Sequence, residues 1–73
     1  MKNISLKQIG YVCYSFRRIK GYRQKDIADD LGMSEQSISL FENGKNNSAT
    51  ILLWYIRHGL TINEIAKGEV ITW

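Results

Sequence analysis

The chain has 73 residues, of which 44% are hydrophobic and 23% are charged, and its formal net charge is +3. This size and composition predict one small globular domain and argue against a disordered chain. No apolar run approaches the roughly 20 residues that cross a membrane, and no secretory signal pattern is recognisable. The single cysteine, Cys13, has no partner for a disulfide and too few neighbours for a zinc site, so we expect it to be a small buried hydrophobe.

The positive charge is concentrated in the first third of the chain. Seven of the ten Lys and Arg residues lie between Lys2 and Lys25. A basic cluster of this kind favours an anionic partner, with a solvated helix face as the alternative.

A first helix is predicted to begin just after Ser5 and to end at Gly21. Ser5 and Gln8 have the spacing of a capping box, which marks a helix N-terminus, and glycine is a common residue just after a helix. The predicted core face of this helix consists of Leu6, Ile9, Val12, Cys13 and Phe16. Tyr11 and Tyr14 lie off that face. We expect them to lean on the surface, with contact to a partner as the alternative.

Two short helices joined by a tight turn are predicted over residues 24–44. The first has one apolar face, made of Ile27, Ala28 and Leu31. Gly32 then stands where a residue with positive φ ends a helix, and the hydroxyl of Ser34 can cap the next one. The apolar stripe of the second helix consists of Ile38 and Phe41.

The outward face of this second helix is mostly polar. Its residues are Gln36, Ser39, Leu40 and Asn43, with Glu35 at the margin near the helix N-terminus. Amides, a hydroxyl and one aliphatic group suit the edges of base pairs in a major groove.

A fourth helix is predicted between Ser48, its N-cap, and Gly59. One of its faces consists of Ile51, Trp54, Tyr55 and His58. A second apolar face consists of Leu52, Leu53 and Ile56. A protein of this size cannot bury both faces against its own core. We expect His58 to lie at the edge of the core rather than to act as a ligand or base.

The last predicted helix begins with a capping box at Thr61 and Glu64 and stops at Gly68. The tail that follows, residues 69–73, is unusually apolar for a chain end. We therefore expect this tail either to pack against the domain or to meet a partner.

These patterns together resemble the DNA-binding helix-turn-helix of the lambdoid phage repressor and Cro family, also called the XRE or Cro/C1 type. The residues that carry the resemblance are Gln24, Ala28, Gly32, Ser37, Ile38, Glu42, Asn43, Gly44 and Lys45. The resemblance extends from Ile9 to Gly68. It implies an all-α fold, a compact bundle of five short helices, in which residues 1–73 form a single DNA-binding domain with its helix-turn-helix at 24–43. It also implies a transcriptional regulator, most like a phage repressor or Cro, that binds a pseudo-palindromic operator in double-stranded DNA as a homodimer.

The resemblance implies roles for individual residues. Base pairs would be read by Glu35, Gln36, Ser39 and Leu40. DNA phosphates would be contacted by Arg23, Gln24, Ser37, Asn43 and Lys45. Arg17 and Glu42 match a partly buried structural ion pair of the family, and each flanks the apolar stripe of its own helix. Glu35 and Leu40 depart from the glutamine-rich pattern of some relatives, so those relatives do not supply the operator sequence.

The surplus apolar residues predict a two-fold dimer interface. They are Leu52, Leu53, Ile56, Val70, Ile71 and Trp73. In the alternative, the tail folds back and covers the fourth helix of its own domain.

A second interpretation of the whole chain is a protein-interaction module, such as an antitoxin or a regulator controlled by an antirepressor. We expect no enzymatic activity, no cofactor and no metal, because the chain has one His, one Cys and no Gly-rich phosphate loop. The expected location of a DNA-binding regulator is the nucleoid in the cytoplasm.

Overall fold

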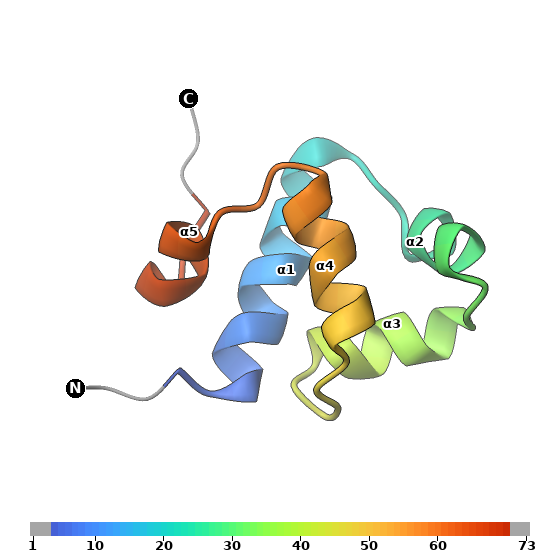
Figure 1. Cartoon of the computed structure of the whole chain (residues 1–73), viewed down its shortest axis with the longest axis horizontal. Coiled ribbons are helices and arrows are strands. Elements are labelled where there is room, and N and C mark those ends of the chain that lie inside the picture. The colour runs from blue at the N-terminus through green and yellow to red at the C-terminus, as the bar shows by residue number, and fades with distance from the viewer. Residues whose placement is uncertain (1–3, 71–73) are drawn as a thin grey trace.

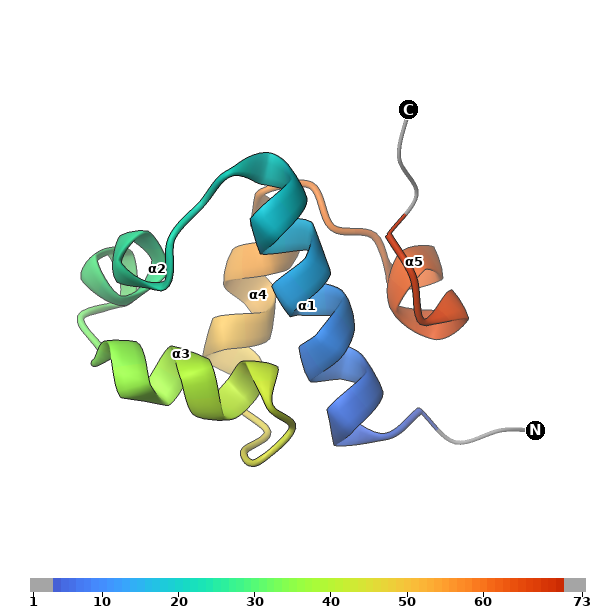
Figure 2. The same cartoon turned by 180° about the vertical axis from the view of Figure 1, so that it is seen from behind.

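The computed structural model describes residues 4–70, which form five α-helices and no β-strand within that range (Figure 1). The helices are α1 (Leu6–Lys20), α2 (Gln24–Leu31), α3 (Glu35–Glu42), α4 (Ala49–Arg57) and α5 (Ile62–Lys67). α1 and α4 lie side by side at the centre, α2 and α3 lie to one side of them, and α5 packs against α1 on the other (Figures 1 and 2). The all-α bundle of five short helices that the sequence predicts is confirmed.

Local hydrogen bonds and glycines set most of the helix ends, as predicted. The residues whose side chains accept a hydrogen bond from a backbone N–H of the first turn are Ser5, Ser34, Ser48 and Thr61. The glycines that follow a helix in the left-handed conformation are Gly21, Gly32 and Gly68. At α2, where Arg23 offers no side-chain acceptor, the carboxylate of Asp26 accepts the Arg23 backbone N–H at 2.8 Å.

The capping box predicted for α1 is wrong in its second half. The Gln8 backbone N–H donates to Ser5 Oγ at 3.0 Å, but the Gln8 side chain does not return to the cap. Its Nε2 atom donates instead to the carbonyl oxygen of Ile65 at 3.0 Å. Gln8 therefore ties the start of α1 to the end of α5.

One apolar core lies between the helices. Its buried hydrophobic members are Val12, Cys13, Phe16, Ile27, Ala28, Ile38, Phe41, Ile51, Trp54, Tyr55, Leu60 and Ile65. The prediction that Cys13 is a small buried hydrophobe is confirmed. The prediction that Leu6 belongs to the core is wrong, because Leu6 is 43% exposed. The apolar contacts of α1 with the core begin one turn later, at the half-buried Ile9.

Gly10 allows α1 to approach the end of α3 closely. It is buried, although the sequence pattern did not place it in the core. A Cβ atom at this position would lie 2.5 Å from the carbonyl oxygen of Phe41 and 2.6 Å from that of Glu42. Only glycine leaves room for this contact between two backbones.

α4 buries one of its two predicted apolar faces. Trp54 and Tyr55 are in the core, whereas His58 is the exposed C-cap residue, with its ring stacked on Trp54 at 3.7 Å between ring centroids. On the second face, Ile56 is half-buried and Leu53 is 50% exposed. The core thus leaves part of this second face open to solvent.

Candidate nucleic-acid interface

Apolar contacts between α2 and α3 fix the geometry of the two helices. Ile27 and Ala28 of α2 are buried in the same core as Ile38 and Phe41 of α3. The turn between the helices passes through Gly32, whose φ of 65° suits glycine. Because both helices are anchored by their inward residues, the opposite face of α3 has a fixed position on the surface.

The outward face of α3 exposes most of the predicted base-reading residues. Glu35, Gln36 and Leu40 are exposed, whereas Ser39 is half-buried. The Asn43 amide nitrogen donates to the carbonyl oxygen of Ser39 at 2.8 Å, which holds the C-terminal end of this face in place. An amide that both donates and accepts, beside an aliphatic side chain, can contact an adenine edge and a thymine methyl group.

Ser37, a predicted phosphate contact, takes part in the cap of α3. Its backbone N–H donates to Ser34 Oγ at 3.2 Å, and the two hydroxyl oxygens are 3.0 Å apart. The Ser37 hydroxyl is therefore already engaged at the helix N-terminus, so a phosphate contact there would be shared with Ser34.

Glu42 is the centre of a buried polar network that joins four helices. Its carboxylate accepts hydrogen bonds from Arg17 Nε at 2.8 Å and Arg17 Nη2 at 3.1 Å. It also accepts from Gln24 Nε2 at 3.2 Å and from the Tyr55 hydroxyl. Burial, followed by this bond to Glu42, raises the pKa of the Tyr55 hydroxyl, so that Tyr55 remains a donor. The expected partners Arg17 and Glu42 thus form an ion pair that links α1 to α3.

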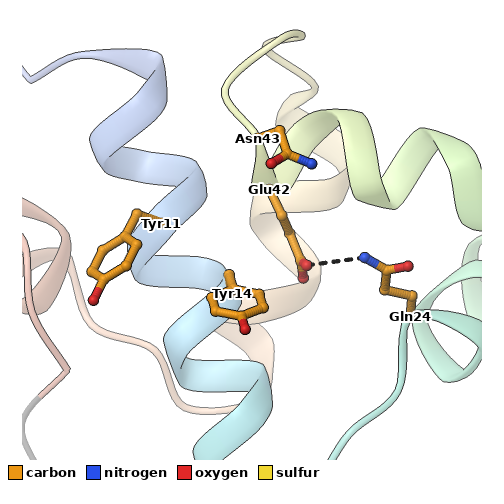
Figure 3. Close-up of a pocket in the computed structure, with 5 residues that line it drawn as sticks. All are labelled: Tyr11, Tyr14, Gln24, Glu42 and Asn43. Atoms are coloured by element: carbon orange, nitrogen blue, oxygen red, sulfur yellow. Dashed lines mark hydrogen bonds between the residues drawn. The ribbon is translucent and has the colours of Figure 1, made fainter.

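A pocket of about 250 Å³ opens where α1, α2 and α3 meet. It is lined by Tyr11, Tyr14, Gln24, Glu42 and Asn43 (Figure 3). The Gln24 amide nitrogen points at the Glu42 carboxylate (Figure 3). A side-chain amide has two N–H groups, so the second one can serve a ligand in the pocket. The structure therefore brings together Gln24 and Asn43, which the sequence assigns to phosphate.

Arg23 and Lys45, the two predicted cationic phosphate contacts, are both exposed. Arg23 Nη2 lies 2.9 Å from Asp26 Oδ1. The hydrogen bonds from Arg23 lower the pKa of the Asp26 carboxyl. An exposed pair of this kind contributes little stability and can yield to a phosphate. Lys45 follows α3, and its backbone N–H donates to the carbonyl oxygen of Leu40 at 2.9 Å.

Sequence reasoning missed the position of Tyr11 and Tyr14 in this pocket. It placed both tyrosines off the core face of α1, which is where they lie. The available signal was the helical spacing of the two tyrosines with Lys7 and Arg18. That spacing does not reveal the pocket, because the other walls come from α2 and α3.

The predicted dimer residues that the structure describes differ in burial. Leu52 and Val70 pack against the core of their own domain, Ile56 is half-buried, and Leu53 is exposed. Two predicted residues lie outside the described range: Ile71 and Trp73. Ile62 of α5, which the sequence did not indicate, is 67% exposed. The open apolar surface on α4 is thus narrower than predicted, with Leu53 as its exposed member.

Among residues 4–70, no group of three or more His, Cys, Asp or Glu side chains is placed to hold a metal ion. In the same range, no helix has the length and apolar character needed to cross a membrane.

Comparison with known proteins gives one family match. A family model described as helix-turn-helix matches residues 14–54, more than half of the chain, from the middle of α1 to the middle of α4. This range contains α2 and α3 and, of the Glu42 network, Arg17, Gln24 and Glu42, whereas Tyr55 lies one residue beyond it. No significant match was found among curated proteins or among solved structures.

Proposed function

The chain belongs to the XRE and Cro/C1-type helix-turn-helix family of DNA-binding transcription regulators, and on that basis we propose that it binds a specific operator in double-stranded DNA as a repressor or Cro-like regulator. The observation that supports this most strongly is the exposed face of α3, where Gln36 and Leu40 lie on a helix anchored from behind by Ile38 and Phe41. A rigid helix with such a face suits insertion into a major groove. The proposed place of action is the nucleoid in the cytoplasm.

In this proposal Gln36 is the principal base reader. Its amide can donate to and accept from one adenine edge, which a carboxylate cannot do. Glu35 accepts only, so it favours a cytosine amino group. Leu40 offers apolar contact to a thymine methyl group, and Ser39 assists from its half-buried position.

Phosphate contacts position α3 and supply most of the affinity. Gln24 is the first residue of α2, where N–H groups without partners inside the helix attract phosphate. Asn43 lies in the same pocket as Gln24. Arg23 and Lys45, exposed cations on either side of the helix-turn-helix in the sequence, attract phosphates at its two ends. Ser37 adds a phosphate contact at the N-terminus of α3.

We further propose a two-fold homodimer, because an operator half-site is short and two copies of α3 can occupy successive major grooves. The proposed interface includes Leu53 and Ile56 of α4, Val70, and the predicted tail residues Ile71 and Trp73 outside the described range. Leu52, which packs on the core, would support the interface from behind.

Sedimentation of the full chain, alone and with the selected duplex, tests the dimer. We expect two copies per duplex and a shift toward one copy in Leu53→Asp, whereas Lys67→Asp, a charge change at an exposed position of α5, retains two. A wild-type chain that remains monomeric under both conditions rules out the dimer.

The competing interpretation is a protein-interaction module, such as an antitoxin or an antirepressor-controlled regulator, that meets its partner through α4 and the C-terminal tail. The exposed Leu53 of α4 supports it. It predicts a protein partner and does not require selection of a DNA sequence.

In vitro selection from a random duplex pool, followed by footprinting, separates the two interpretations. The DNA-binding proposal predicts enrichment of a pseudo-palindrome with half-sites about one helical turn apart. Failure to enrich any sequence, at both low and physiological salt, overturns the proposal.

A further inference from the structure

An exposed stripe of two cations and two tyrosines runs along α1. Lys7, Tyr11, Tyr14 and Arg18 recur at the spacing of one helix face and are all exposed. Tyr11 is 59% exposed and Tyr14 is 38% exposed. α1 contains no Asp or Glu among its 15 residues. Exposed aromatic rings between cations, on a helix without acidic residues, suit an anionic partner.

Tyr14 is held in a defined orientation on this stripe. Arg18 Nη1 donates a hydrogen bond to the Tyr14 hydroxyl oxygen at 3.2 Å. The guanidinium carbons of Arg17 and Arg18 lie 5.5 and 5.7 Å from the centre of the Tyr14 ring, within the range of cation–π contacts. Because Arg18 donates to the hydroxyl oxygen, the hydroxyl proton is directed elsewhere and remains available to an acceptor.

The position of Tyr14 indicates what that acceptor is. Tyr14 lines the same pocket as Gln24 and Asn43, which come from α2 and α3 (Figure 3). The negative charge of Glu42 at this pocket is matched by two hydrogen bonds from Arg17. The Asn43 amide nitrogen donates to the carbonyl and hydroxyl oxygens of Ser39 at 2.8 and 3.4 Å. An anion in the pocket therefore meets its donors from two helices, the Tyr14 hydroxyl of α1 and the second N–H of the Gln24 amide of α2. Continuity with the proposed DNA surface favours a backbone phosphate over an acidic peptide.

We infer that Tyr14 is a DNA-backbone contact. Its hydroxyl donates a hydrogen bond to the phosphate that Gln24 binds in this pocket, and Arg18 beside it supplies positive charge. α1 thereby becomes a third element of the DNA interface, in addition to α2 and α3. This inference rests on the proposed function, because it takes the pocket to lie against the DNA backbone.

The test compares Tyr14→Phe with Tyr22→Phe in the full chain. Both variants lose one hydroxyl and keep the ring, but Tyr22 packs against Trp54 and His58 and does not line the pocket. Affinity is measured by fluorescence anisotropy on the selected duplex and on a scrambled duplex over a range of salt concentrations. Melting temperatures of the two variants are recorded alongside.

We expect Tyr14→Phe to bind both duplexes about tenfold more weakly, as for the loss of one hydrogen bond to a charged group. Its salt dependence should not change, because no charge is removed, whereas Arg18→Gln should lower the salt slope by about one. Tyr22→Phe should bind like wild type.

Tyr14→Phe affinity within about twofold of wild type would overturn the inference while leaving the proposed function intact, since wild type would still select its operator. A loss of affinity that depends on the identity of one base pair would also overturn the inference, because a phosphate contact has no base preference. If wild type selects no duplex at all, the proposed function fails, and the inference fails with it.

Discussion

Replacing the buried Glu42 of α3 with alanine is expected to destabilise the protein strongly. The variant removes the acceptor of two Arg17 donors, of the Gln24 amide and of the Tyr55 hydroxyl. Arg17 is 9% exposed and Tyr55 is fully buried, so water cannot readily replace the lost partner. An unpaired cation and an unpaired hydroxyl then remain in the core.

The expected loss follows from the burial of the pair. Removing one partner of a buried ion pair costs about 3–5 kcal/mol. A folded chain of 73 residues has a total stability of about 4–11 kcal/mol by the usual value per residue. The melting temperature of Glu42→Ala should therefore fall by at least about 12 °C, and the variant is expected to be partly unfolded at growth temperature if the parent lies at the lower end of that range.

Thermal and urea denaturation followed by circular dichroism measure this loss. Tyr55→Phe is a graded comparison, because it removes one donor and leaves the ion pair, at a cost of about 1 kcal/mol. Glu69→Ala is the matched control, since Glu69 is exposed and its removal should change stability by less than about 0.5 kcal/mol. A melting temperature of Glu42→Ala equal to that of the parent would refute the reasoning.

Two further predictions concern the core. Gly10→Ala should lower the free energy of unfolding in urea by several kcal/mol, because the alanine Cβ would meet two backbone carbonyl oxygens at 2.5 and 2.6 Å. This loss should outweigh the gain of about 1 kcal/mol from the higher helix propensity of alanine. A variant more stable than the parent would show that this close contact is absent. Burial, followed by the charge of Glu42, raises the pKa of Cys13 from 9.0 to about 12. The stability that depends on the protonated thiol is therefore fully present below pH 9 and is lost as pH rises toward about 12, at up to about 1.4 kcal/mol per pH unit. Cys13→Ala should lack this pH-dependent contribution. Equal slopes of unfolding free energy against pH for the parent and Cys13→Ala, measured between pH 9 and 12, would contradict the prediction.

The helix ends could be predicted because their causes are local. Ser34 and Ser48 cap helices that begin at the next residue, and Gly32 ends α2 with a positive φ. Two features of α1 could not be predicted, because they depend on distant residues. Gln8 bonds to Ile65 at the other end of the sequence, and Gly10 is required only because the end of α3 lies against it.

The candidate site also has one part that could be predicted from local sequence and one part that depends on distant residues. Helical spacing alone places Gln36 and Leu40 on the outward face of α3, where the structure exposes them. The pocket that contains Tyr14 could not be predicted, since three helices have to meet before Tyr14 shares a cavity with Gln24 and Asn43. The family resemblance assigned Gln24 and Asn43 to phosphate contacts, but it gave no reason to assign Tyr14 to the same site.

The central claim is that the exposed face of α3 reads DNA sequence. The most direct test of this claim is the base preference of the Gln36→Ala variant. Selection from a random duplex pool is repeated with wild type, Gln36→Ala and Lys45→Ala. On the site selected by wild type, Gln36→Ala should lose about 1–3 kcal/mol of binding free energy. It should also relax the base preference at one base pair in each half-site. Lys45→Ala should weaken all sequences alike and lower the salt slope by about one. Wild-type affinity and wild-type base preference in Gln36→Ala would contradict the claim.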